Sequence, residues 1–330
     1  MKVLLTDLDG TCVHYMDDPS AEGPWGQVAD QPDNAGLLPC TSPDGSRSTL
    51  LLRLPPSASG AQGLISLPTL RLYAALRALG VKLVVITGAR LSTLLGRLPS
   101  IPAADAYVCE GGGRIFYPAP SAALPTAAPL TEDLAWREVQ AGAAGPAGQD
   151  TVPPERRQGA LWSFYASLAA SAQASGIRLD AASYTTAFRV KGQPEAVAAA
   201  LQGLPPGLAT ALNLGAADVF PATSGKENAA RYLMQRFGAE PAECNFMCDD
   251  DNDLGLAALV RKAYLPGITA PSVAAAVAAA PHRFHVAASR GPFGAEEVLR
   301  LLVAEQMAEA DGQGRQAEDG GQAAAAPASA

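Results

Sequence analysis

The sequence predicts an α/β protein with a Rossmann-like three-layer core, a central parallel sheet and an inserted α+β domain. Three features support this fold class. Short apolar runs near residues 3–5, 82–87 and 245–248 have the continuous hydrophobicity of strands that are buried on both faces of a parallel sheet. Segments with apolar residues at helical spacing separate these runs, as crossover helices do. Residues 118–221 interrupt the pattern and have the size of a small domain.

The composition limits what the protein binds. The chain has 330 residues, enough for two domains, and 48% of them are hydrophobic, which argues against a disordered protein. Its net charge is −8 and it has no run of basic residues, so nucleic acid is not an expected partner. No apolar stretch has membrane-spanning length, and Met1 leads straight into a strand. We therefore expect neither a membrane protein nor a secreted one.

The cysteines indicate a reducing compartment. They are odd in number and lack CxxC spacing, which argues against a disulfide framework and against a zinc site. They are Cys12, Cys40, Cys109, Cys244 and Cys248. We expect a cytoplasmic protein, with import into an organelle from a longer precursor left open, and a monomer or a weak homo-oligomer.

The N-terminal strand carries the first candidate site. Its apolar residues 3–5 lead into Asp7 and Asp9, which the alternation of side chains along a strand places on one side. Two carboxylates that close repel each other unless a cation lies between them or one is protonated. Gly10 then allows a tight turn. The alternative is an ordinary acidic turn, because Asp-Gly is a common turn pair.

Residues 16–64 form an unusually long connection. They are rich in Pro, Gly, Ser and Asp and contain one strand-like patch, at 50–54. A connection of this length is usually a functional flap or a disordered insertion, and both interpretations stay open here. A helix is expected next, from Ser66 to the stop at Gly80.

The strand at 82–87 ends in Thr87 and Gly88. A hydroxyl and a free backbone N–H at the start of a helix can hold a phosphate, although a threonine there is more often a plain helix cap. A hairpin is then expected, with strands at 106–109 and 114–117.

Residues 118–221 are predicted to form the inserted domain. In one of its strands Arg189 and Lys191 lie on the same side, where they could hold an anionic substrate or simply face solvent. The expected elements are a helical segment around Trp136, a helix at 154–175, a strand at 183–191, a helix at 194–201 and a strand at 209–220.

The parallel-sheet pattern resumes after the insert. Lys226 opens a helix, and the strand at 245–248 ends in an acidic run from Asp249 to Asp253. An acidic helix start is favoured by the helix dipole, but five polar residues in a row exceed what capping needs. The remaining expected elements are strands at 263–265 and 284–287, a helix at 294–308 and a disordered low-complexity tail at 309–330.

The predicted core comprises residues 1–117 and 222–308. Polar groups lie at four places in it, each at the end of a strand or at the start of a helix. Ligands of open α/β sheets bind beyond the carboxyl ends of the strands, so we expect these groups to converge on one crevice. Carboxylates with water form the oxygen-rich shell that Mg²⁺ prefers, and a lysine with a hydroxyl can hold a phosphoryl group. This combination predicts a phosphoryl-transfer site. The groups are Asp7 with Asp9, Thr87 with Gly88, Lys226, and Asp249 to Asp253.

The order of these motifs resembles the haloacid dehalogenase-like (HAD) superfamily over nearly all of residues 1–305. The insert is similar to the type-2 cap of that superfamily, and residues 217–226 look like its sucrose-phosphate phosphatase and Cof-type branch, in particular uncharacterised plant and algal members. The resemblance implies a Mg²⁺-dependent phosphatase that acts on a small phosphorylated metabolite, with a sugar phosphate as the expected class of substrate.

The resemblance also implies a role for each motif residue. Asp7 is the expected nucleophile, which forms an aspartyl-phosphate, and Asp9 is the expected acid and base. Lys226 would tether Asp7 and the phosphate, while Asp253 and Asn252 would orient the metal shell. The expected contacts are Thr87, Gly88 and Asn252 for the substrate, and Asp7, the Asp9 carbonyl, Asp249 and Asp253 for Mg²⁺.

Some positions depart from the family pattern. Cys248 stands in place of the usual Gly, Asp250 in place of a small residue, Gly111 in place of Asn, and Arg90 one place later than the family's arginine. The changes at Cys248 and Asp250 remove no catalytic group, and Arg90 is left out of the expected site. Two alternatives stay open: a phosphosugar mutase, because type-2 caps also occur there, and a non-catalytic sugar-phosphate-binding regulatory protein. Dehalogenation is disfavoured because it does not need Asp9.

Overall fold

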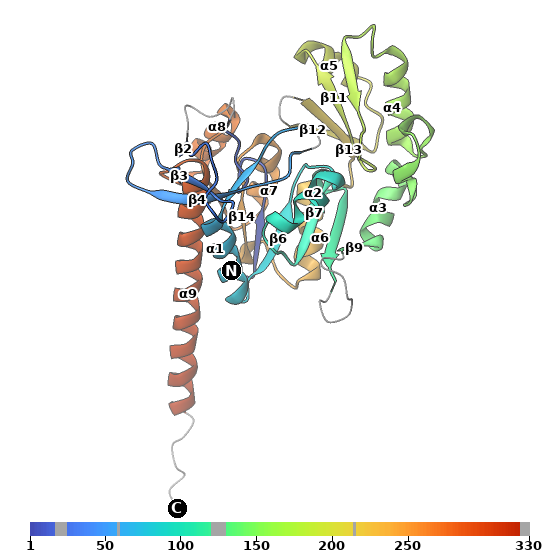
Figure 1. Cartoon of the computed structure of the whole chain (residues 1–330). Coiled ribbons are helices and arrows are strands. Elements are labelled where there is room, and N and C mark those ends of the chain that lie inside the picture. Colours follow the sequence, from blue (N-terminus) through green and yellow to red (C-terminus); the bar gives the residue numbers. More distant parts are fainter. Residues whose placement is uncertain (17–24, 58–59, 120–129, 214–215, 324–330) are drawn as a thin grey trace, which may run out of the picture.

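A central sheet between two layers of helices forms the core of the computed structural model, which describes residues 1–16, 25–57, 60–119, 130–213 and 216–323, the last thirteen as backbone only. Figure 1 shows this core, a separate sheet with its own helices at the upper right, and a long C-terminal helix. The strand order of the central sheet is β16-β15-β14-β1-β6-β7-β8-β9. Its strands are β1 (Val3–Thr6), β6 (Lys82–Ile86), β7 (Ala106–Cys109), β8 (Arg114–Pro118), β9 (Leu130–Glu132), β14 (Cys244–Met247), β15 (Lys262–Leu265) and β16 (Phe284–Val286).

The central sheet confirms the predicted fold class. β1 lies between β14 and β6 and pairs with both in parallel, while β8 and β9 extend one edge of the sheet in antiparallel orientation. The side chains of β1 alternate between two apolar layers, with Val3 and Leu5 in one and Leu4 in the other. Both faces of the sheet are therefore buried, as the continuous apolar runs predicted.

Helices cover each face. The layer that contains Leu4 receives side chains from α1, α2 and α9, and the layer that contains Val3 receives them from α6, α7 and α8. Ser66 caps the first of these helices, because its side chain accepts a hydrogen bond from the backbone N–H of Thr69. The six helices are α1 (Leu67–Ala78), α2 (Leu91–Arg97), α6 (Lys226–Arg236), α7 (Leu254–Leu259), α8 (Pro271–Ala279) and α9 (Gly291–Ala323).

The long connection after the first strand folds into a second, antiparallel sheet. Only the patch at 50–54 was predicted, and it lies largely in β4; the other strands are short, and Pro39 interrupts the apolar pattern of β3. The sheet packs against α9 through Phe293. Its described strands are thus part of the core and not a loose insertion. They are β2 (Gln27–Val28), β3 (Leu38–Thr41), β4 (Ser48–Arg53) and β5 (Leu64–Ser66), in the order β2-β3-β4-β5.

The inserted domain has a third sheet, of order β10-β11-β13-β12, with its own apolar core. The expected helical segment around Trp136 and the helix at 194–201 are confirmed as α3 and α5. β9 joins the central sheet, although its residues were predicted to belong to the insert. The elements of the insert are α3 (Leu134–Ala144), α4 (Ala160–Ser171), α5 (Pro194–Leu201), β10 (Ile177–Asp180), β11 (Phe188–Gly192), β12 (Leu208–Asn213) and β13 (Ala216–Pro221).

Three details of the insert differ from the prediction. The expected strand at 209–220 is a hairpin, because the chain reverses so that Asn213 lies opposite Ala216. The expected helix at 154–175 begins only at Ala160, after Gly159, whose φ of 106° does not continue a helix. The expected strand at 183–191 begins only at Phe188, and β10 was not predicted.

The C-terminal helix is longer than predicted. Residues 309–323, which were expected to be disordered, continue α9, and residues 324–330 lie outside the described part of the chain. The N-terminal ammonium group of Met1 lies 2.7 Å from the Glu309 carboxylate and ties the helix to the core just past its predicted end. Within the described residues, no helix is both long and apolar enough to cross a membrane.

Candidate active site

Asp7 lies at the carboxyl end of the central strand β1. Its backbone N–H donates to the Met247 carbonyl at the end of β14, at 2.9 Å, so the neighbouring strand fixes its position. The side chain is 8% exposed. The predicted crevice therefore begins at the buried carboxylate of Asp7, directly after the end of β1.

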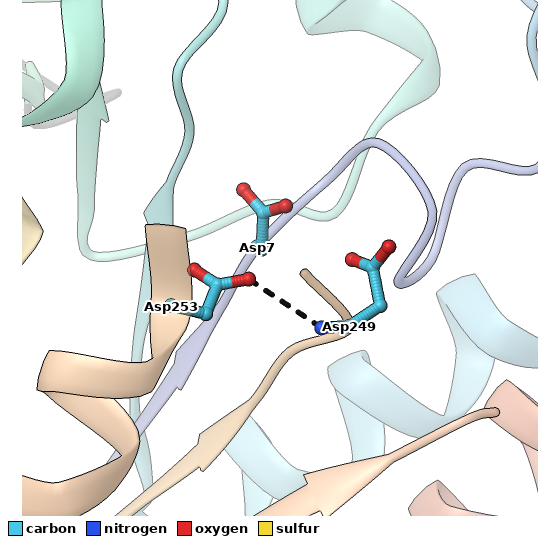
Figure 2. Close-up of side chains that lie close together, drawn as sticks. All are labelled: Asp7, Asp249 and Asp253. Atoms are coloured by element: carbon cyan, nitrogen blue, oxygen red, sulfur yellow. Dashed lines mark hydrogen bonds between the residues drawn. The ribbon is translucent and has the colours of Figure 1, made fainter. Parts of the chain in front are cut away.

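Three carboxylates from two segments meet at this strand end. One oxygen each of Asp7, Asp249 and Asp253 lies within 4.8 Å of the other two, and all three residues are buried. Figure 2 shows Asp253 turned toward Asp249, whose backbone N–H lies 3.4 Å from the Asp253 carboxylate. The structure thus brings together the predicted nucleophile and two of the predicted metal residues.

The turn after β1 fits around this cluster. Gly10 has a φ of 86°, and a Cβ there would lie 1.9 Å from Oδ2 of Asp249. Only glycine can therefore occupy this position without displacing the carboxylate. Thr11 follows, and its hydroxyl donates to Oδ1 of Asp249 at 2.5 Å. The sequence Asp-Gly-Thr thus shapes the cluster in addition to making a turn.

Lys226, the first residue of α6, provides the positive charge of the cluster. Its ammonium Nζ lies 3.0 Å from Oδ1 of Asp7 and 2.6 Å from Oδ1 of Asp253. It also donates to the side-chain oxygen of Asn252, at 3.3 Å. Burial opposes its charge, but the carboxylates of Asp253 and Asp7 outweigh burial and hold the pKa of Lys226 above its usual value.

One lysine does not balance the buried negative charge. Burial, opposed by Lys226 and reinforced by Asp253, raises the pKa of Asp7 to about 7. Burial and the charge of Asp7 raise the pKa of Asp249 well above its usual value. The pKa values are raised because several carboxylates lie close together in a buried place. Such a group of carboxylate oxygens suits a hard divalent cation such as Mg²⁺, which would offset their negative charge.

The side chain of Asp9 does not join this cluster. Its Oδ1 accepts hydrogen bonds from the hydroxyl of Tyr15 and from Nη1 of Arg97, the latter at 2.8 Å. The alternation rule that predicted a shared side for Asp7 and Asp9 does not apply, because β1 ends at Thr6 and Asp9 already lies in the following turn. The metal contact expected from Asp9 involved its backbone carbonyl and not this side chain.

The predicted phosphate seat lies at the end of β6, next to β1. The Thr87 hydroxyl accepts a hydrogen bond from the Ala89 N–H at 3.1 Å, so it acts as a local turn cap. Its own O–H remains a possible donor to an anion. Gly88 lines a pocket of about 350 Å³ between core and insert.

The same pocket brings core and insert residues together. Gly88, Lys226 and Asn252 line it from the core, and Tyr184, Thr210 and Phe220 line it from the insert. Arg189 and Lys191, which could have held an anionic substrate, form ion pairs with carboxylates of the insert itself. Their partners are Asp218 at 2.6 Å for Arg189 and Asp180 at 2.8 Å for Lys191.

Sequence reasoning missed the residues that join the insert to the core. Glu110, buried on the core side, accepts hydrogen bonds at its Oε2 from the backbone N–H of Thr185 at 2.9 Å and of Thr186 at 2.7 Å. Arg90 pairs with Asp180 at 2.6 Å. Glu110 precedes three glycines and has a φ of 54°, which is unusual for a residue with a side chain, but no sequence pattern reveals that angle.

The fold matches those of several solved structures, among them a sucrose-phosphatase. The sucrose-phosphatase from Synechocystis sp. PCC6803, solved in complex with sucrose and phosphate, has 15% identity and a TM-score of 0.55, over 92% of this chain and 97% of that one. The Thermoplasma acidophilum protein 0175 has 11% identity and a TM-score of 0.54, over 91% and 96%. A protein from a study of a trigonal-bipyramidal intermediate in a phosphoryl-transfer superfamily has 14% identity and a TM-score of 0.51, over 92% and 97%.

These matches confirm the expected fold: the chain shares the arrangement of core and insert with a sucrose-phosphatase and with a member of a phosphoryl-transfer superfamily. No protein-family model and no curated protein sequence matches the chain. We call the insert the cap from here on. The similarity concerns the arrangement of sheet, helices and cap, and the chemistry has to be argued from the residues of this chain.

Proposed function

We propose that this protein is a Mg²⁺-dependent phosphatase that hydrolyses a small phosphate monoester through an aspartyl-phosphate on Asp7. The observation that carries the proposal is the buried group of Asp7, Asp249 and Asp253 around Lys226, where Lys226 also lines a pocket between core and cap. A binding protein would have no need of a buried carboxylate placed between a lysine and a metal site, whereas a nucleophile would.

The carboxylates fit Mg²⁺: Asp7, Asp249 and the Asp9 carbonyl would hold the ion, and Asp253 would orient that shell. When bound, the ion neutralises charge on the phosphoryl oxygens. The other part of that work falls to Lys226, whose Nζ is placed between Asp7 and Asp253. The raised pKa of this lysine keeps it charged at any pH near neutrality.

The reaction then has two steps on this scaffold. A carboxylate oxygen of Asp7 attacks phosphorus, the bond between phosphorus and the alcohol oxygen breaks, and the alcohol takes a proton from Asp9. Water next attacks the phosphorus of the aspartyl-phosphate, gives a proton to Asp9, and releases inorganic phosphate and a regenerated Asp7. Thr87, the Gly88 amide and Asn252 are the proposed contacts of the phosphoryl group.

A sugar phosphate is the proposed class of substrate. The pocket combines the lysine of the site with hydroxyl and aromatic groups of the cap, Thr210 and Tyr184, which suit a polyhydroxyl molecule. A volume of about 350 Å³ corresponds to a small molecule and not to a polymer. We further infer a cytoplasmic protein, in keeping with its five buried free cysteines.

Phosphate release from a panel of sugar phosphates tests this function, with Mg²⁺ and with EDTA, for the parent protein and for Asp7→Asn. We expect release that requires Mg²⁺ and that is lost in Asp7→Asn. An isomerised sugar phosphate without free phosphate would instead support a mutase. Tight binding of a sugar phosphate with no turnover under any condition would support a regulatory protein.

A further inference from the structure

The carboxylate of Asp9 is held at one oxygen only. Its Oδ1 accepts from both Arg97 and Tyr15, and Nη1 of Arg97 also lies 3.0 Å from the Tyr15 hydroxyl, so the three side chains form a closed set of contacts. No described residue donates a hydrogen bond to Oδ2. The Asp9 side chain is 25% exposed whereas that of Arg97 is 1% exposed. One oxygen is therefore fixed by two donors, and the other has no donor among the described residues.

Arg97 is itself fixed by the segment before β5. The arginine is the last residue of α2, and its guanidinium donates to the carbonyls of Pro55 at 3.3 Å and Ala61 at 3.4 Å. A Cβ on Gly63 would lie 2.6 Å from Val13 and 3.3 Å from Nη2 of Arg97. The segment therefore packs directly against the guanidinium, and that position tolerates no added side chain without a shift.

The same segment is bonded to the turn that carries Asp9. The backbones of His14 and Leu64 exchange two hydrogen bonds, at 2.8 and 2.9 Å. Asp9 thus lies in a loop whose far end pairs with β5, and its side chain contacts an arginine that donates to the Pro55 and Ala61 carbonyls. The small antiparallel sheet that the sequence left unexplained has a structural connection to the proposed acid and base.

We propose that Arg97 and Tyr15 are positioning residues for the proton transfer by Asp9, and that the backbone at Pro55 and Ala61 holds Arg97 for this purpose. This inference rests on the proposed phosphatase function. With Oδ1 occupied, the proton is carried on Oδ2. When the bond from phosphorus to the alcohol oxygen breaks, the proton of Oδ2 passes to that oxygen, and Arg97 neutralises the carboxylate that remains. When water attacks the aspartyl-phosphate, its proton returns to Oδ2.

A series of aryl phosphates separates this role from a structural one. The leaving phenols range from acidic (p-nitrophenol) to weakly acidic (phenol), so the need for a proton donor rises along the series while the shape of the substrate changes little. We compare kcat and kcat/KM for the parent, Arg97→Met and Tyr15→Phe. The matched control is Arg137→Met, because Arg137 is 3% exposed and donates to the Pro146 carbonyl, far along the chain from Asp9.

In Arg97→Met we expect turnover of phenyl phosphate to fall about 10–100-fold more than turnover of p-nitrophenyl phosphate, in line with the usual size of general acid catalysis. In Tyr15→Phe we expect a smaller change of the same kind, since one donor remains. Arg137→Met should affect both esters equally. If Arg97→Met does not fold, as judged by circular dichroism, the relative loss of Tyr15→Phe on the two esters tests the inference.

Equal losses on both esters in Arg97→Met and Tyr15→Phe would overturn the inference and leave the phosphatase standing. A parent that hydrolyses neither these esters nor any sugar phosphate of the panel, or an Asp7→Asn variant that hydrolyses both esters as fast as the parent, would refute the phosphatase itself and this inference with it.

Discussion

We expect the buried carboxylate of Asp7 to destabilise the metal-free protein, and we expect the substitution Asp7→Asn to stabilise it. Asp7 is buried, and in the folded protein its pKa is about 7, against 3.8 for a free side chain. Between these two pH values the folded state holds a proton that the unfolded state has lost. The free energy of unfolding therefore falls as the pH rises through this window, and the loss is complete above pH 7.

The size of the effect follows from the shift. About three pKa units at about 1.4 kcal/mol each give an upper limit of about 4 kcal/mol at pH 8. Asparagine removes this cost but also removes one of the two carboxylates that Lys226 contacts, so we expect a net gain of about 2–4 kcal/mol. In a chain of this size that corresponds to a rise of about 3–6 °C in the midpoint of thermal unfolding.

Thermal unfolding in EDTA at pH 8 and pH 5 measures this gain. The rise should be largest at pH 8 and less than half as large at pH 5, where the folded parent keeps its proton on Asp7. Asp30→Asn, which changes an exposed aspartate, serves as the control and should leave both midpoints unchanged. If the unfolding midpoint of Asp7→Asn at pH 8 were equal to or lower than that of the parent, the argument that burial disfavours the ionised form of Asp7 would be wrong.

The remaining predictions concern the lysine, a glycine and the cap. Lys226→Met removes the cation that faces two buried carboxylates and should lower metal-free stability at pH 8 by about 3–5 kcal/mol, seen as a lower unfolding midpoint; an unchanged midpoint would contradict the ion pairs. Gly112→Ala, whose Cβ would lie 2.3 Å from the Gly225 carbonyl oxygen, should destabilise by about 1–3 kcal/mol in urea unfolding. Asp180→Asn weakens the contact with Arg90 and should raise KM for the best sugar phosphate several-fold in steady-state kinetics; an unchanged KM would show that this contact does not hold the cap.

Much of the candidate site could be predicted because its signals are local. An apolar strand that ends in a carboxylate predicts both the position of Asp7 and its burial, and the same pattern places Asp249 at the end of β14. Parallel strands then bring such ends to one edge of the sheet without further information. Lys226 was predictable only as a member of the motif set, because a lysine at a helix start is common.

The contacts that span the fold were not predictable. The side chain of Asp9 rests on Arg97, 88 residues away, and nothing in the sequence near either residue indicates this pair. Glu110 reaches cap residues 75 positions further on. Such contacts depend on how separate segments pack, and a polar residue carries the same local signal whether its partner is a distant side chain or water.

The small sheet at 27–66 shows a second limit. Its strands are two to six residues long, so most lack the repeated alternation that identifies a strand, and the composition favoured a flap or a disordered insertion instead. The helix beyond residue 308 was missed for the opposite reason. Its Gly-rich, low-complexity composition indicated disorder, while Ala, Gln and Glu in the same stretch favour helix.

The most direct test of the central claim is chemical trapping of Asp7. The parent is mixed with its best sugar phosphate and Mg²⁺, quenched in acid within one turnover and treated with borohydride, which reduces an acyl phosphate to an alcohol. Peptide mass spectrometry should then find homoserine in place of aspartate at Asp7, only when substrate is present. Rapid turnover with unmodified Asp7, or with the reduced residue at another aspartate, would contradict the proposed mechanism.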